Sequence, residues 1–230
     1  MKPGNGSKLL ALSLCASLGA APSIAAADDI DIFTGASAGS SINPRILVVL
    51  DNTSNWSRQS QQWPGGLSQG RSEANALRTL LPTLTDKINF GVMEYVTGSS
   101  SGTTADGGFI RSAVLPMDSG NKTLLDTELG VIYDNINAPD EKVNANTPYG
   151  NLMYDVYNYF AGANSYAPTA VLASKADERG YSSAYARFQS PLTKDNTCGR
   201  SFVIFIGNPN SSGPSADSPA NTTALTALTD

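Results

Sequence analysis

The chain has 230 residues and a formal net charge of -5, so nucleic acid is not an expected partner. It contains no histidine, which excludes serine–histidine–aspartate catalysis and histidine-ligated zinc. A hydrophobic fraction of 40% and a charged fraction of 15% are typical of a folded protein, with room for one good-sized domain.

Residues 1–27 have the pattern of a secretory signal peptide. Two lysines are followed by the apolar run Leu9–Ala21, and the small residues Ala25–Ala27 precede a cleavage point before Asp28. The apolar run is too short to cross a bilayer well, so no stable membrane span is predicted. We therefore expect export through the inner membrane.

The first strand of the mature chain follows an extended lead-in, residues 28–44. The continuous apolar run Ile46–Leu50 is typical of a strand that is buried on both faces of a parallel sheet. Ligand sites in open α/β sheets lie just past the carboxyl ends of such strands. Asp51, Thr53 and Asn55 offer oxygen atoms at alternate positions there, which predicts a cation or phosphate site.

A loop, Asn52–Gly70, connects this strand to a helix. It contains Trp56 and Trp63, for which we consider two interpretations: aromatic side chains exposed on a binding surface, or local packing of a long loop. Apolar residues at helical spacing then predict a helix over Ser72–Leu81, which Pro82 ends.

An antiparallel hairpin is predicted next. Ile88–Val96 alternates as a strand does, Gly98–Gly108 is rich in turn residues, and Phe109–Leu115 forms a second strand. Asn121 or Thr123 can then cap a helix whose apolar residues recur at helical spacing.

Thr147 and Pro148 predict the start of another helix, with the threonine as N-cap and the proline in the first helical position. Residues 161–200 lack clean periodicity and are expected to form an insertion. Phe202–Ile206 is the second strand of the buried type. Residues 211–230 are expected to be a disordered low-complexity tail or a truncated continuation.

This order of elements predicts an α/β fold. We expect a three-layer sandwich over residues 45–210, with a mostly parallel sheet, one antiparallel hairpin strand, and helices on both faces. In such a sheet, Asp51, the helix start at Thr147 and the strand end at Ile206 converge on one edge. Mg²⁺ and Ca²⁺ prefer oxygen ligands of the kind found there.

These segments resemble the metal-ion-dependent adhesion site of von Willebrand factor type A domains. Asp51, Thr53 and Asn55 follow an apolar strand with the spacing of the family motif Asp-x-Ser-x-Ser. Thr147–Tyr154 is similar to the loop and helix that supply the threonine of that site, and Phe202–Asn210 to the strand whose end supplies a second aspartate.

A more specific resemblance is to the amino-terminal domain of type IV pilus tip-associated adhesins, the PilY family. It rests on the acidic start Asp28–Asp31, on Pro44-Arg45 before the strand, on Cys198 shortly before the later strand, and on Pro209-Asn210 after it. It covers residues 28–210, and family members continue into a β-propeller, so this chain is expected to be incomplete at its C-terminus.

The resemblance implies a non-enzymatic adhesion and assembly protein of the pilus. Its expected partners are minor pilins, other pilus components, and a ligand on a host or abiotic surface. Its expected location is the periplasm and the cell surface at the pilus tip.

The site departs from the family pattern at two positions. Asn55 replaces a hydroxyl residue, and Asn208 stands where the second aspartate is expected. The predicted Mg²⁺ or Ca²⁺ site of Asp51, Thr53, Asn55, Thr147 and Asn208 is therefore degenerate, and its cation affinity should fall. The alternative is structural, with Asp51 bound to backbone amides and Thr147 capping its helix.

Two other functions are considered. One is a non-adhesive structural subunit of an extracellular assembly, which the sequence does not separate from an adhesin. The other is a haloacid dehalogenase-like phosphatase, which also places an aspartate after an apolar strand. That class needs a second acid two residues later, where this chain has Thr53.

Overall fold

The computed structural model describes eight ranges of the chain, which are residues 42–53, 55–58, 63–95, 107–142, 148–167, 175–196, 198–208 and 219–227. The predicted signal peptide, most of the lead-in, and Thr147 lie outside these ranges. All described residues belong to one structural unit, Ile42–Asp230.

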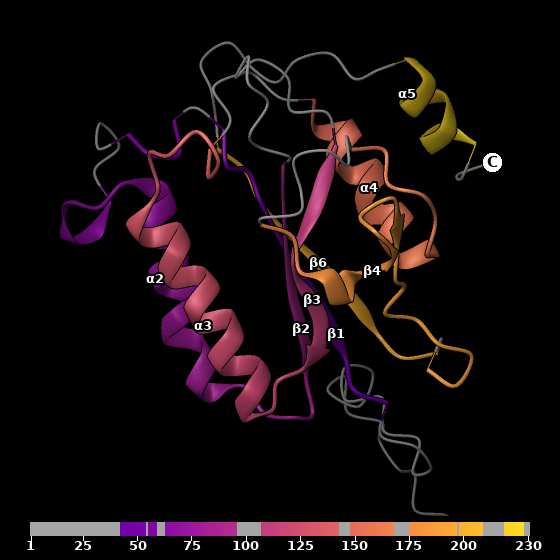
Figure 1. Cartoon of the computed structure of the whole chain (residues 1–230), viewed down its shortest axis with the longest axis horizontal. Coiled ribbons are helices and arrows are strands. Elements are labelled where there is room, and N and C mark those ends of the chain that lie inside the picture. Colours follow the sequence, from indigo (N-terminus) through magenta and orange to yellow (C-terminus); the bar gives the residue numbers. More distant parts are fainter. Residues whose placement is uncertain are drawn as a thin grey trace, which may run out of the picture. The chain divides into compact units, whose positions relative to one another are not determined.

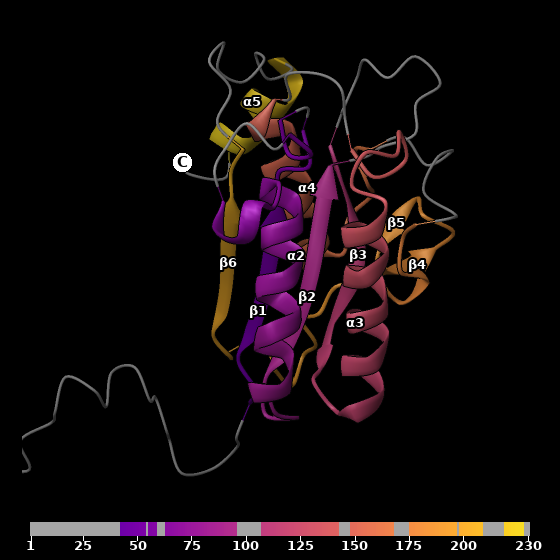
Figure 2. The same cartoon turned by 90° about the vertical axis from the view of Figure 1, so that its left-hand side faces the viewer.

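A four-stranded sheet forms the centre of this unit, with the strand order β3-β2-β1-β6. Its strands are β1 (Arg45–Leu50), β2 (Asn89–Tyr95), β3 (Gly108–Pro116) and β6 (Ser201–Ile206). β1 runs parallel to both β2 and β6, whereas β3 pairs antiparallel with β2 (Figure 2). The prediction of an α/β fold with a mostly parallel sheet and one antiparallel strand is confirmed.

Helices lie on both faces of the sheet. α2 (Gln69–Leu80) and α3 (Ser119–Asp134) pack side by side on one face, and α4 (Tyr149–Ala161) packs on the other (Figure 1). α2 continues into a short 3-10 turn, Leu81–Thr83, because Pro82 cannot extend the α-helix.

The apolar run of β1 is continuous because helices cover both faces of this strand. Val48 and Leu50 belong to the core under α2 and α3, and Leu47 and Val49 belong to the core under α4. Successive side chains of a strand point to opposite faces, so a central strand between two helical layers needs apolar residues at every position.

Two helix starts differ from the prediction. The N-cap of α3 is Asp118, whose side chain accepts the N–H of Asn121 at 2.9 Å, so the predicted caps Asn121 and Thr123 are wrong. α4 begins at Tyr149, and Pro148 occupies the N-cap position with an extended backbone rather than the first helical position.

The insertion and the tail contain more regular structure than predicted. Within residues 161–200, the turn Glu178–Gly180 leads into a small antiparallel sheet of β4 (Tyr181–Ser183) and β5 (Arg187–Phe188). The tail, predicted to be disordered, contains the helix α5 (Pro219–Thr226), which contacts α4.

β6 corrects a further prediction, since it is not buried on both faces. Phe202, Val203, Ile204 and Phe205 are 48%, 43%, 48% and 36% exposed. β6 lies at the edge of the sheet and pairs, among the described strands, with β1 alone (Figure 2). An apolar run predicts a strand but does not reveal whether that strand has a neighbour on its second side.

None of the helices in the described ranges has the length and apolar character needed to cross a membrane.

Candidate functional site

The candidate site lies at the carboxyl ends of β1 and β6. Asp51 directly follows β1, and Asn208 follows β6 by two residues. One carboxylate oxygen of Asp51 accepts the N–H of Asn208 at 2.9 Å, and the other accepts the N–H of Thr53 at 3.2 Å. The Asn208 amide group donates to the carbonyl and the hydroxyl of Thr53, at 2.9 and 3.3 Å. Three of the predicted site residues are thus brought together, and all three are buried.

Burial and hydrogen bonding have opposite effects on the pKa of Asp51. Burial raises its pKa, because the carboxylate has lost most of its water. The N–H groups of Asn208 and Thr53 and hydrogen bonds from the side chains of Thr53 and Tyr149 oppose this by stabilising the charged form. Tyr149 begins α4, so the start of this helix reaches the site, and burial raises the pKa of its hydroxyl to about 12.

These donors decide how well the centre fits a cation. An ionised carboxylate has about four lone-pair positions, and four hydrogen bonds act on Asp51. A cation bound directly to Asp51 would have to displace one of these donors. The Asn208 side-chain oxygen is the one oxygen here that is buried without a hydrogen-bond partner in the described structure. The residues present therefore do not fit a cation held by the Asp51 carboxylate.

Of the two other members of the predicted metal site, the structure describes only Asn55. Asn55 lies in the turn that follows, where its backbone carbonyl accepts the N–H of Arg58 at 2.9 Å. Thr147 is outside the described residues, so its role as a metal ligand stays a prediction, whereas its predicted role as N-cap is wrong because Pro148 occupies that position. Within the described ranges, no three carboxylate, thiol or imidazole side chains gather in a way that could hold a metal ion.

A second acid, Glu73, lies near Asp51 and was missed from the sequence. Its carboxylate accepts the indole N–H of Trp56 at 2.6 Å and the amide N–H of Gln69 at 2.7 Å. Burial, with a smaller contribution from the charge of Asp51, raises the pKa of Glu73 to about 7. Only the docking of α2 brings Glu73 here, and because α2 begins at Gln69, inside the segment predicted to be a loop, the four-residue spacing of Gln69 and Glu73 on one helix gave no signal in the sequence.

Trp56 is fully buried, so its interpretation as an exposed aromatic is wrong and local packing is confirmed for it. Its indole lies against Gly70 in the first turn of α2. A Cβ atom at Gly70 would come within 2.6 Å of the Trp56 ring and 2.5 Å of Ile136, so the close approach requires glycine. The N–H of Gly70 also donates to the Trp56 carbonyl at 2.9 Å. The segment after β1 is therefore fixed onto α2.

Trp63 behaves differently, because it helps to form an accessible apolar cavity beside the site. The cavity has a volume of about 480 Å³ and lies between the outer flank of α2, the turn Pro64–Gly66 and the end of β6. Its lining includes Trp63, Leu67, Glu73, Leu77 and Ile206. Apolar walls with one buried acid are typical of a small binding surface.

A second charged centre lies close by and is joined to the first through Asn52. The Asn52 side chain donates to the backbone carbonyls of Tyr95 and Glu141, at 3.3 and 3.1 Å, and accepts the N–H of Tyr95 at 3.1 Å. The ends of β1 and β2 and the segment after α3 are thereby held together by one buried amide.

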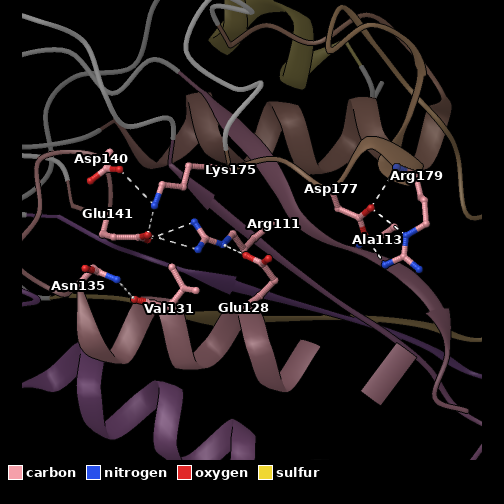
Figure 3. A network of polar contacts seen from close by, with 10 residues as sticks. All are labelled: Arg111, Ala113, Glu128, Val131, Asn135, Asp140, Glu141, Lys175, Asp177 and Arg179. Atoms are coloured by element: carbon pink, nitrogen blue, oxygen red, sulfur yellow. Dashed lines mark hydrogen bonds and ion pairs between the residues drawn. The ribbon is translucent and has the colours of Figure 1, made fainter. Parts of the chain in front are cut away.

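Arg111 is the central cation of this second centre (Figure 3). Its guanidinium pairs with the buried Glu141 at 3.1 Å and with Glu128 on α3 at 3.0 Å. Lys175 pairs with the same Glu141 and with Asp140, the latter at 3.2 Å. Arg111 thus donates hydrogen bonds to Glu141, whereas its contact with Glu128 is an ion pair without hydrogen-bond geometry.

Glu94, at the carboxyl end of β2, is the unusual member of this centre. It is fully buried, and neither carboxyl oxygen has a hydrogen-bond partner within the described structure. Burial raises its pKa to about 8, although the positive charge of Arg111 acts in the opposite direction. The neutral, protonated form of Glu94 is therefore favoured at neutral pH.

Comparison of the chain with models of known protein families, with curated proteins and with solved structures gives no match.

Proposed function

We propose that this chain is a binding module with a von Willebrand factor A-like fold, an exported adhesion and assembly protein of type IV pili. It would act in the periplasm and at the pilus tip on the cell surface, with minor pilins and other pilus components as partners. The Asp51 centre would be the degenerate counterpart of the metal-ion-dependent adhesion site, with hydrogen bonds on the Asp51 carboxylate in place of a cation.

One observation supports this proposal above the others. Asp51, Thr53 and Asn208, which the resemblance to the adhesion motif singled out, meet at the ends of two neighbouring parallel strands, where Asn208 donates to Asp51 and to Thr53 at 2.9 Å each. The doubly wound α/β arrangement, with β3 antiparallel at one edge, is of the kind that the resemblance implies.

The same contacts favour binding over catalysis. A phosphatase of the haloacid dehalogenase type would use an aspartate oxygen as its nucleophile. The oxygens of Asp51 accept hydrogen bonds from two backbone N–H groups and two hydroxyls, and Asp51 is almost completely buried. A carboxylate held in this way is a structural anchor for the loop rather than a reacting group.

The ligand surface is proposed to be the cavity that Trp63 lines. It is the accessible apolar surface next to the Asp51 centre, and it shares Glu73 with that centre. A host or abiotic surface ligand would contact Trp63 and Leu67 there. A non-adhesive structural subunit would make no use of this cavity.

The test measures retention of the purified chain on glass and on an immobilised host matrix protein. We expect Trp63→Ala to reduce retention at least fivefold, because aromatic side chains dominate the energy of small interfaces. The matched control is Leu124→Ala, which removes an apolar side chain that is 52% exposed on α3.

Equal retention of the two variants would contradict a role for the cavity. Failure of the unsubstituted chain to bind either surface would contradict the adhesin and favour the structural subunit.

A further inference from the structure

Two cations without a carboxylate partner lie close together beyond the carboxyl end of β1. Arg58 follows the turn after Asp51, and Lys142 lies in the segment after α3. Among the described residues, Arg58 is the one charged group that acts on the pKa of the Lys142 amine. Neither cation belongs to an ion pair of the described structure. Two like charges in this position repel each other unless an anion balances them.

The Lys142 amine is held in a defined place by Ser57. The Nζ atom of Lys142 donates to the hydroxyl oxygen of Ser57 at 2.8 Å, and Ser57 is buried. An ammonium group has three N–H donors, so two of them stay available for a ligand. Partial burial, together with the charge of Arg58, lowers the pKa of Lys142. A bound anion would oppose both effects, because it stabilises the charged ammonium group.

The backbones that carry the two cations are fixed to the rest of the fold. Trp56, two residues before Arg58, is fully buried and packs against the first turn of α2. On the other side, the carbonyl of Glu141, next to Lys142, accepts the Asn52 amide at 3.1 Å. The two segments therefore hold their positions without a ligand, and the site is preorganised.

The acids closest to this pair in the sequence are already engaged elsewhere. Asp140 and Glu141 both pair with Lys175, on the side of the Arg111 centre (Figure 3). The stretches that adjoin the two cations, residues 59–62 and 143–147, contain no aspartate or glutamate in the sequence. The balancing negative charge is therefore expected from a ligand rather than from these parts of the chain.

We propose that Lys142 and Arg58 bind a phosphate group, with Ser57 holding the lysine in position. A guanidinium group presents a fork of N–H donors that matches the oxygens of phosphate, and an ammonium group adds a point charge. A phosphate ester carries about two negative charges at neutral pH, so it balances both cations, whereas a carboxylate balances one. None of the three residues lines the Trp63 cavity, so this site is separate from the proposed adhesion surface.

The first test is a calorimetric titration of the purified full chain with inorganic phosphate at constant ionic strength. We expect Lys142→Met to weaken phosphate binding at least tenfold and Arg58→Gln at least threefold, because each change removes a positive charge and its donors. The matched control is Lys87→Met, which removes an exposed lysine just before β2, at the opposite end of the sheet. Acetate should bind the unsubstituted chain at least tenfold more weakly than phosphate does.

The second test follows the Lys142 amine itself, so it does not depend on a variant that binds phosphate. Bound phosphate should raise the pKa of Lys142, because it stabilises the ammonium form. The measurement is a pH titration by NMR of the chain with isotope-labelled lysine, with and without phosphate. The signal of Lys142 is identified by its loss in Lys142→Met, and the signal of Lys87 should not respond to phosphate.

A third measurement distinguishes a free phosphate from one displayed on a surface. It compares retention of the chain on phosphatidylcholine vesicles with and without phosphatidic acid. Retention that requires both phosphatidic acid and Lys142 would support a surface phosphate, and binding of inorganic phosphate alone would support a free one.

Three results would overturn the proposal. One is a failure of the unsubstituted chain to bind either form of phosphate. Another is equal phosphate affinity of Lys142→Met and Lys87→Met, and the third is an affinity for acetate that equals the affinity for phosphate.

Discussion

Asp51 and Glu94 lie at the carboxyl ends of the neighbouring strands β1 and β2, and both are buried, yet their surroundings differ. Asp51 receives hydrogen bonds from two backbone N–H groups and two hydroxyls. Glu94 receives no hydrogen bond from the described residues, although Arg111 is its neighbour. Burial raises the pKa of both carboxyl groups, and the hydrogen bonds that Asp51 receives oppose this rise, whereas Glu94 has only the charges of neighbouring side chains to oppose it.

The largest expected effect on stability comes from replacing Arg111, the cationic neighbour of Glu94. Arg111→Leu leaves the buried Glu141 without its guanidinium partner and removes the larger of the two positive charges, those of Arg111 and Lys175, that oppose the effect of burial on the pKa of Glu94. We expect a loss of about 3–5 kcal/mol in the free energy of unfolding, measured in urea.

Arg78→Leu is the matched control, because the Arg78–Asp126 pair has the same chemistry at 2.8 Å but is 39% and 47% exposed. It should change the free energy of unfolding by less than about 1 kcal/mol. Equal losses in the two variants would show that the buried ion pairs of Arg111 stabilise the fold no more than the exposed Arg78–Asp126 pair does.

A smaller, pH-dependent effect is expected for Glu94→Gln. Because the pKa of Glu94 rises from 4.5 to about 8 on folding, the folded state holds the proton more tightly. The stability that follows from this is fully present below pH 4.5 and is lost as the pH rises through 8. The glutamine cannot ionise, so the loss of stability between pH 5 and pH 9 should shrink by about 2–4 kcal/mol.

The measurement is the free energy of unfolding at pH 5, 7 and 9. Asp195→Asn, which changes an exposed acid, should keep the pH dependence of the unsubstituted chain. An unchanged slope in Glu94→Gln would mean that the carboxyl is already ionised at pH 7.

The smallest effect on stability is expected from adding divalent cations, which the Asp51 centre should bind weakly or not at all. Because four hydrogen bonds already act on the Asp51 carboxylate, millimolar Mg²⁺ or Ca²⁺ should leave the melting temperature within about 1 °C of its value in chelator. Thermal melts monitored by circular dichroism provide the measurement. A rise of several degrees that Asp51→Asn abolishes would restore the metal site that the sequence motif predicts.

Much of the fold could be predicted from the sequence because its signals are local. The continuous apolar run of β1, the alternation in β2 and β3, and the helical spacing in α2, α3 and α4 each identify an element within a short window. The start of α3 was less secure, because Asp118, Asn121 and Thr123 can all cap a helix, and only the contact at 2.9 Å selects Asp118.

The site was predicted in part, for a related reason. Asp51, Thr53 and Asn208 follow strand ends, and the parallel pairing of β1 with β6 brings strand ends together. Glu73 and the burial of Trp56 depend on how α2 docks beside β1, which no local pattern contains. The exposure of β6 depends on a neighbouring strand, which the composition of β6 does not reveal either.

The close packing of Trp56 on Gly70 has a consequence for any ligand of this face. A loop that is disordered before binding must lose conformational entropy when the ligand orders it, at a cost of about 1–2 kcal/mol per residue. The segment from Asp51 to Thr53, with Trp56 beyond it, is already fixed by β6, α2 and the indole–Glu73 contact. Binding there would begin from a preorganised surface, so even a small apolar cavity could give useful affinity.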